Sequence, residues 1–178
     1  MDYLVLGLLL FKEMTIYELN NSFKKGLSLI YSASYGSLQN AVKKLLKNEW
    51  ITYEEMVDCG RNKKIYHINQ SGSEAFYQWM YGDISDKKLE VTILSKIYFM
   101  GLLKNKEERL ELLVKMIEQV KETMDKLDAY ENDLKSLDLP EAYKLIAKYQ
   151  FKTLNYGINS HDAALIWLKE LYDEVTEE

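Results

Sequence analysis

The chain has 178 residues, of which 47% are hydrophobic and 29% charged, and its formal net charge is −5 at pH 7. This length suffices for one or two packed domains, and a single proline leaves long stretches open to helices. The best apolar run, Leu4 to Phe11, is far shorter than the roughly 20 residues of a membrane span and follows no basic leader. We therefore expect a cytoplasmic protein with no membrane contact.

The residues available for chemistry are few. A single cysteine, Cys59, excludes an intramolecular disulfide, and a free thiol is typical of a reducing compartment. The two histidines and this cysteine show no zinc-ligand spacing, so we expect no metal and no cofactor. The sequence also has no glycine-rich phosphate loop and no nucleophile elbow. These features argue against an enzyme.

Two short helices are predicted at the start of the chain. The first covers residues 3–11 and breaks at Lys12-Glu13. Thr15 and Glu18 have the spacing of a capping box, so a second helix should begin at Thr15 and run to about Lys25.

The segment that follows carries the most informative pattern. Apolar residues at positions 38, 41, 42 and 45 have helical spacing and place one stripe toward a core. The opposite face offers ammonium groups for phosphates, amides for base edges, and a glycine that permits close approach. This face and its flanks consist of Gly36, Ser37, Gln39, Asn40, Lys43, Lys44 and Lys47.

Two alternating strands come next, separated by a basic turn at Gly60-Arg61. The order of helix, strand, basic turn and strand is that of a winged helix, a variant of the helix-turn-helix. Residues 24–64 contain eight basic and four acidic side chains, so positive charge gathers here although the whole chain is acidic. A further helix is expected after Asn69 or Ser71.

Three motifs, in the right order, resemble the PadR family of bacterial transcriptional regulators. They are LVLGLLLFKEMTIYEL from Leu4 to Leu19, GSLQNAVKKLLKNEWI from Gly36 to Ile51, and GRNKKIYHINQSG from Gly60 to Gly72, followed by Trp79. The chain departs from the family pattern at five positions. Ile16 and Glu49 replace glycines, Gln39 and Asn40 replace a Tyr-Pro pair, and Asn62 replaces the wing proline.

The resemblance implies a sequence-specific regulator, a repressor rather than an activator, that binds a near-palindromic double-stranded DNA operator as a homodimer. We expect the lysines to contact phosphates, Arg61 to contact phosphate or the minor groove, and Asn40 and Gln39 to read base edges. The start of the helix should anchor the DNA backbone. The expected DNA-binding residues are Ser34, Tyr35, Ser37, Gln39, Asn40, Lys43, Lys44, Arg61, Lys63 and Lys64.

Long helices are predicted beyond residue 83. From Leu110 to Leu134, apolar residues recur with heptad spacing, interrupted at Glu131. Such an apolar stripe must pack against another helix. Pro140 suits the first turn of that next helix, and Gly157 to Ser160 is a place for a kink or an interruption. The region resembles the helical, virulence-activator-like C-terminal domain of longer PadR-like regulators, which mediates homodimerisation. The expected coiled-coil dimer seam is Leu110, Leu113, Ile117, Val120, Met124 and Leu127.

The predicted fold is mostly α, with an N-terminal winged helix-turn-helix and two-stranded wing over residues 1–82 and a helical dimerisation and effector domain over residues 83–178. Two alternatives stay open: heptads that pack only within one subunit, and an interaction adaptor that has lost DNA binding. A small hydrophobic effector is expected at a pocket around Trp79, Tyr98, Phe99 and Trp167, with a filled aromatic core as the competing interpretation.

Overall fold

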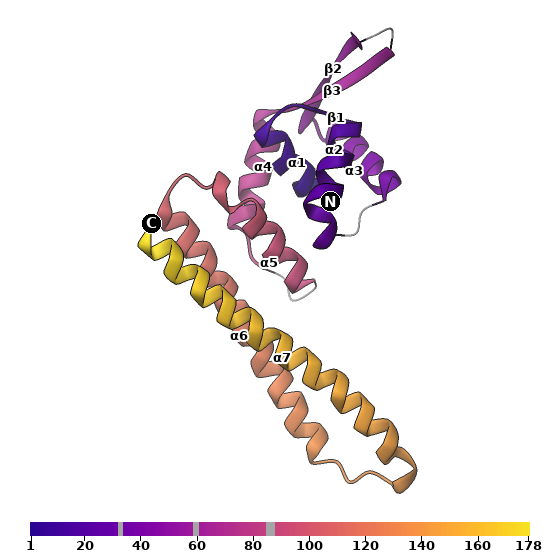
Figure 1. The fold of residues 1–178 in the computed structure, drawn as a ribbon, viewed down its shortest axis with the longest axis vertical. Coiled ribbons are helices and arrows are strands. Elements are labelled where there is room, and N and C mark those ends of the chain that lie inside the picture. Colours follow the sequence, from indigo (N-terminus) through magenta and orange to yellow (C-terminus); the bar gives the residue numbers. More distant parts are fainter. Residues whose placement is uncertain (32–33, 59–60, 85–87) are drawn as a thin grey trace. The chain divides into compact units, whose positions relative to one another are not determined.

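The computed structural model describes residues 1–31, 34–58, 61–84 and 88–178, apart from the side chains of Leu29, Asp58 and Arg61 (Figure 1). Within these ranges, no helix has both the length and the apolar character needed to cross a membrane.

The chain divides into two compact units. The first consists of Met1–Asp83 and Glu90–Gly101, and the second of Ile84–Leu89 and Leu102–Glu178. Most of helix α5 (Leu89–Tyr98) thus belongs to the first unit, although the sequence places it after the division at residue 82. The functional division into residues 1–82 and 83–178 stays a prediction.

The first unit is a winged helix built around the apolar helix α1 (Asp2–Phe11), in which residues 4–9 are all buried. Helices α3 and α4 and strand β3 contact α1. The other elements of this unit are α2 (Ile16–Lys25), the 3-10 turn η1 (Leu27–Leu29), α3 (Tyr35–Lys47), α4 (Gln70–Tyr81) and α5, which is followed by the 3-10 turn η2 (Met100–Leu102). The predicted order of elements is confirmed.

Phe99 attaches the end of α5 to α1. Its side chain is fully buried, with ring centroids 5.6 Å from Phe76 and 5.9 Å from Phe11. A Cβ atom added to Gly7 would lie 2.6 Å from the Phe99 ring, so the glycine is what allows this close approach.

The predicted capping box fixes the start of α2. The Thr15 hydroxyl accepts a hydrogen bond from the Glu18 amide at 3.2 Å, and the Thr15 amide donates to the Glu18 carboxylate at 2.8 Å. The Thr15 amide is also the main reason why the pKa of Glu18 lies below its usual value.

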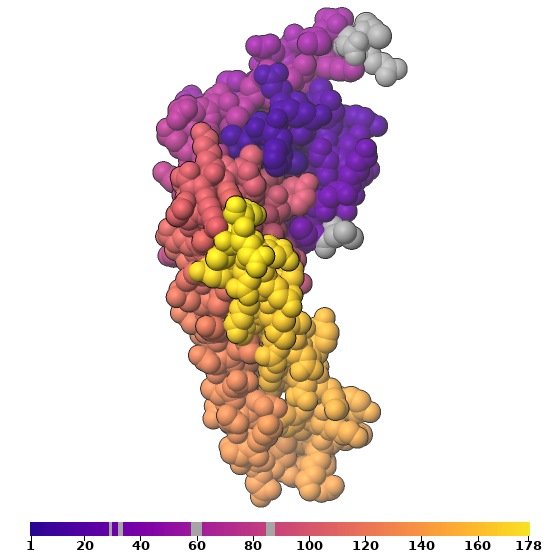
Figure 2. Space-filling model, turned by 60° about the vertical axis from the view of Figure 1, so that its left-hand side comes forward, coloured from indigo at the N-terminus to yellow at the C-terminus, as the bar shows by residue number. Residues whose placement is uncertain are grey.

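Three antiparallel strands form a sheet in the order β1-β3-β2, with bounds β1 (Met14–Thr15), β2 (Ile51–Asp58) and β3 (Arg61–Ile68). Strands β2 and β3 are the predicted wing, paired from Ile51 with Ile68 to Asp58 with Arg61. They extend outward from the helices of this unit (Figures 1 and 2). The two-residue strand β1 was not predicted, because so short a segment carries no alternation.

The second unit is dominated by the antiparallel pair α6 (Lys106–Lys135) and α7 (Glu141–Glu177) (Figure 1). At one end of the pair, Lys106 donates to the Thr176 carbonyl and Arg109 pairs with Glu178 at 2.6 Å. Buried and half-buried residues recur on α7 every three or four positions, which is the pattern of a helix packed along a partner. The recurring positions are Ala147, Phe151, Leu154, Ile158, His161, Leu165, Leu168, Tyr172 and Val175, and Gly157, Ala164 and Leu171 beside them are also half-buried.

Helix α7 continues through Gly157 to Ser160, so the expected interruption is wrong. The Ser160 hydroxyl donates to the Tyr156 carbonyl at 2.8 Å, and His161 Nδ1 lies 2.8 Å from the Gly157 carbonyl oxygen. These contacts follow the helical i to i−4 spacing and are compatible with an unbroken helix. Pro140 is the N-cap of α7 rather than a residue of its first turn.

Candidate nucleic-acid interface

Helix α3 has the two faces that its sequence predicts. Leu38, Ala41, Val42 and Leu45 are buried, and the residues of the opposite face are exposed. Ser34 caps the helix, since its hydroxyl accepts from the Ser37 amide at 3.1 Å.

The Ser37 hydroxyl in turn donates to the Ser34 carbonyl at 2.7 Å. Both predicted anchoring serines are therefore engaged in the helix start. Their role at a nucleic acid would be to hold the first turn, whose remaining amides form a site suited to a phosphate.

The centre of the exposed face is open for contacts. Gln39, Asn40 and Lys43 are exposed, and within the described ranges none of their side chains has a hydrogen-bond or ion-pair partner. The amides and the ammonium group lie on one helix face, as base reading and phosphate binding together require.

Lys44 differs from Lys43 because an acidic group of α1 already holds it. Its Nζ donates to the Asp2 carboxylate at 2.6 Å. This hydrogen bond, together with the Asp2 charge, raises the pKa of Lys44. The predicted phosphate contact of Lys44 therefore competes with an internal partner.

The strand register separates the two wing lysines. Tyr53 pairs with Tyr66 and Glu55 with Lys64, whereas Met56 pairs with Lys63. Since side chains alternate along a strand, Lys64 lies on the sheet face of buried Tyr66, and Lys63 lies on the other face. The two lysines, grouped together by the sequence, thus point in opposite directions.

Lys64 is held on the wing by neighbours from β2. Its Nζ lies 3.9 Å from the centre of the Tyr53 ring and 3.6 Å from the Glu55 carboxylate. A hydrogen bond with Tyr53 is the main cause of a raised pKa of Lys64. Arg61 lies at the start of β3, but its side chain is outside the described part of the chain, as are Cys59 and Gly60.

The base of the wing is tied to the segment before β1. His67 Nδ1 lies 2.8 Å from the Glu13 carboxylate, while its Nε2 atom is buried and has no partner among the described residues. A carboxylate at Nδ1 favours the tautomer that carries its proton there. The described residues include no group of three or more His, Cys, Asp and Glu side chains placed to hold a metal ion.

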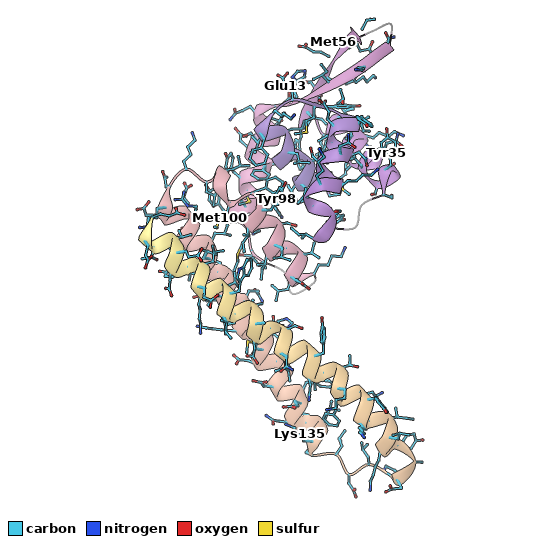
Figure 3. All side chains as sticks on the ribbon, in the orientation of Figure 1. Glu13, Tyr35, Met56, Tyr98, Met100 and Lys135 are labelled. Carbon is cyan, nitrogen blue, oxygen red and sulfur yellow. The ribbon has the colours of Figure 1, made fainter. Side chains whose placement is uncertain are left out.

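Sequence reasoning missed two exposed tyrosines beside this surface. Tyr17, at the start of α2, is 68% exposed, and Tyr53 on β2 is 40% exposed. Tyr17 lies between the two capping-box residues, so its position off the apolar face could have been found from the motif. Tyr35, at the start of α3, and Met56, on the wing, are also exposed and are labelled in Figure 3.

The aromatic residues expected to form an effector pocket are divided between the two units. Phe99 belongs to the packed core of the first unit, where Trp79 stacks on Tyr3 with 5.2 Å between ring centroids. Trp167 belongs to the second unit. This packing favours the competing interpretation of a filled aromatic core, and the pocket remains a prediction.

Two family models match the chain. Residues 5–78 match the transcriptional regulator PadR-like family, and residues 92–176 match the virulence activator alpha C-terminal domain. The chain is 27% identical over 112 residues to the negative transcriptional regulator PadR of Bacillus subtilis, an alignment that spans 60% of each protein.

A probable transcriptional regulator of Mycobacterium tuberculosis is 22% identical over 177 residues, with 90% of this chain and 89% of that protein covered. Among solved structures, Bacillus subtilis PadR in complex with operator DNA aligns with a TM-score of 0.44 and 20% identity. That alignment covers 96% of this chain and 97% of the other.

Proposed function

Because the chain belongs to the PadR-like family of transcriptional regulators, which are not enzymes, we propose that it is a repressor that binds a near-palindromic operator as a homodimer. The observation that carries the proposal is α3. It combines a capped start, a buried apolar face, and an exposed face of amides and ammonium groups beside a basic wing strand.

In this proposal α3 enters the major groove. Asn40 and Gln39 read base edges, for which side-chain amides are suited, and Lys43 binds phosphate. The first turn of α3 binds the DNA backbone, and Lys64 contacts it from the wing face that also holds Tyr66. Repression is supported by the name of the Bacillus subtilis relative, a negative regulator.

The experiment is a salt-titrated mobility-shift assay on a duplex selected from a random library, with a scrambled duplex of equal composition as control. A regulator prefers the selected duplex, and the logarithm of its affinity falls linearly with the logarithm of salt concentration. Absence of binding to both duplexes would favour the adaptor. That alternative is supported by the acidic residues Glu54 and Glu55 on β2 and by Gln39 and Asn40 in place of the family pair.

The homodimer is proposed to form through the outer face of α7. Tyr149, Tyr156 and Trp167 are exposed, and their spacing places them on the side of α7 away from the residues packed along α6. A helix that is apolar on two opposite sides is stable in water only when both are covered. A second copy of this chain would supply that cover.

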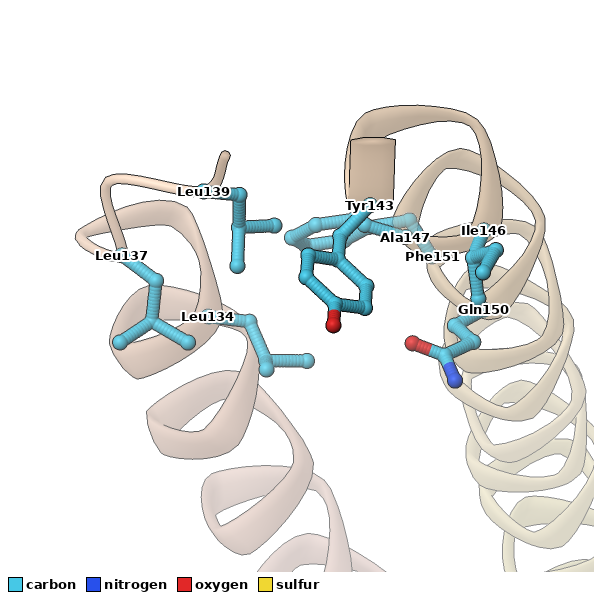
Figure 4. A pocket seen from close by; sticks show the side chains of 8 residues that line it. All are labelled: Leu134, Leu137, Leu139, Tyr143, Ile146, Ala147, Gln150 and Phe151. Atoms are coloured by element: carbon cyan, nitrogen blue, oxygen red, sulfur yellow. The ribbon is translucent and has the colours of Figure 1, made fainter. Parts of the chain in front are cut away.

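A hollow lies at the end of the α6–α7 pair, between the two helices and the segment that joins them (Figure 4). Its volume is about 250 Å³, and Tyr143 and Ile146 on its wall are exposed. The lining residues are Leu134, Leu137, Leu139, Tyr143, Ile146, Ala147, Gln150 and Phe151.

In this proposal the heptad residues of α6, which the sequence predicted as the dimer seam, are not the main dimer contact. Leu113 and Val120 are already fully buried in the single chain, whereas Leu110, Ile117, Met124 and Leu127 are half-buried. This burial supports the alternative in which much of the α6 seam packs within one subunit. The half-buried members would contribute only at the border of the dimer contact.

Control by a small hydrophobic effector is retained as part of the proposal. A ligand acts on operator binding only if it binds one dimer geometry better than another. A planar apolar compound that quenches tryptophan fluorescence and also lowers operator affinity would support this element. Quenching without a change in affinity would contradict it.

A further inference from the structure

The basic face of α3 has an acidic neighbour at one border. Asp2, in the first turn of α1, accepts a hydrogen bond from Lys44 at 2.6 Å, and the exposed fractions of the two side chains are 22% for Asp2 and 62% for Lys44. The contact joins residues 42 positions apart in the sequence. It is therefore a product of the way α1 packs on α3.

Lys44 lies beside the centre of the DNA-facing surface. On a helix with 100° per residue, Lys43 and Lys47 lie near the middle of the exposed face, and Lys44 lies on the border toward Asp2. Without Asp2, Lys44 would extend the row of ammonium groups by one. With Asp2 in place, a phosphate at Lys44 must displace a carboxylate and also lie close to that negative charge.

Asp2 lies in the first turn of α1. The first turn of a helix stabilises a negative side chain, because the free amides there carry partial positive charge. The bond to Lys44 is also charge-assisted, and such bonds are stronger than neutral ones. The carboxylate is thus a lasting competitor for Lys44.

We propose that Asp2 limits the phosphate contacts of the recognition helix α3 by holding Lys44, so that Lys43 binds phosphate and Lys44 does not. The proposal rests on the proposed DNA-binding function and deepens it. Phosphate contacts are made on any sequence, whereas amide contacts depend on the bases. By removing one sequence-independent contact for each helix, Asp2 weakens binding to all duplex DNA.

The test is a double-mutant cycle on the full chain. The variants are Asp2→Asn, Lys44→Ala and both together, with Lys43→Ala as the reference for loss of a phosphate contact. Glu74→Gln removes one negative charge from the exposed side of α4 and serves as the charge-matched control. Each variant is titrated with salt on the selected and the scrambled duplex, and its melting curve establishes that it is folded.

The expected result is that Asp2→Asn tightens binding to both duplexes by up to roughly fivefold for each recognition helix. It also steepens the salt slope by about 0.9 for each helix, or about 1.8 for the dimer. Lys44→Ala alone changes little, and in the Asp2→Asn background it removes the whole gain. Lys43→Ala weakens binding in either background.

Two results overturn the inference while leaving the proposed function intact. One is an effect of Asp2→Asn no larger than that of Glu74→Gln. The other is a loss on Lys44→Ala, with Asp2 present, as large as the loss on Lys43→Ala. Failure of the unaltered chain to bind either duplex would instead overturn the proposed function together with this inference.

Discussion

At the scale of single residues, Glu49 shows how the chain accommodates a departure from its family. It replaces the glycine that usually ends the recognition helix, and it adopts a left-handed backbone with φ of 57°. Its carbonyl oxygen accepts from the Asn69 side-chain amide and from the Ser71 hydroxyl, both at 2.9 Å. The turn is held by these neighbours rather than by the preference of the residue itself.

The first prediction follows from this geometry. A left-handed backbone costs a residue with a Cβ atom roughly 1 to 2 kcal/mol. Glycine avoids that cost, but its extra freedom in the unfolded chain offsets about 0.5 to 1 kcal/mol of the gain. Glu49→Gly should therefore raise the free energy of unfolding by about 0.5 to 1 kcal/mol, measured from the denaturant midpoint. A lower midpoint would show that the Glu49 side chain makes a favourable contact that outweighs the strain.

The same turn explains why Asn69, a predicted cap of the helix that follows the wing, does not cap it with its side chain. Asn69 is the N-cap of α4, but its side chain makes no cap and turns instead to the Glu49 carbonyl. Helical spacing predicts the position of the N-cap residue. It does not predict that the side chain of this residue will form a hydrogen bond with a neighbouring turn instead.

At the scale of elements, the sequence predicted most of what positions the candidate site. The capping box of α2, the buried stripe of α3 and the alternation of the wing strands depend on neighbours within one segment, and all three are confirmed. The packing of one segment on another could not be predicted from such local patterns. The attachment of α5 to α1 depends on Phe99 meeting a helix far earlier in the chain.

The strand register illustrates the same limit. Alternation shows that Lys63 and Lys64 point to opposite faces, but the sequence alone does not say which face continues the core. The burial of Tyr66, which lies on the same face as Lys64, decides it. The ion pair between Asp2 and Lys44 was likewise invisible, because two charged residues in separate helices carry no sign that they will meet.

The second prediction concerns the packing of α4 against the start of β2. A Cβ atom on Gly72 would lie 2.1 Å from the Trp50 carbonyl oxygen, which is a backbone atom and cannot turn aside. Gly72→Ala should therefore lower the free energy of unfolding by about 1 to 3 kcal/mol or more, measured by thermal melting. Operator binding should weaken with it, because the wing begins at this point.

Gly157→Ala is the matched control, because nothing lies within 4 Å of an added Cβ atom in the middle of α7. This change should stabilise the helix by about 0.5 to 1 kcal/mol. Equal melting temperatures for the two variants would contradict the account of Gly72.

At the scale of the whole molecule, the third prediction tests the proposed subunit contact. Tyr156 is 75% exposed, so Tyr156→Glu should leave the single chain folded. In a dimer through the outer face of α7 the new carboxylate would be buried without a partner, which is strongly unfavourable. Light scattering should then report a monomer, and operator affinity should fall because the two half-sites are no longer bound together.

Asn155→Glu provides the comparison, since it adds the same charge at the neighbouring exposed position and away from the apolar stripe. It should leave the dimer intact. A stable dimer for Tyr156→Glu would show that the outer face of α7 is not the subunit contact. The half-buried residues of α6 would then be the remaining candidates for that contact.

If the exposed face of α3 reads DNA sequence, the duplexes that the intact chain selects from a random library should differ from those that Asn40→Ala selects. We predict that the variant loses preference at one base-pair position in each half-site, at a cost of about 1 to 3 kcal/mol on the preferred operator, and keeps its affinity for random DNA. An unchanged set of selected sequences, or an equal loss of affinity on every sequence, would contradict the claim.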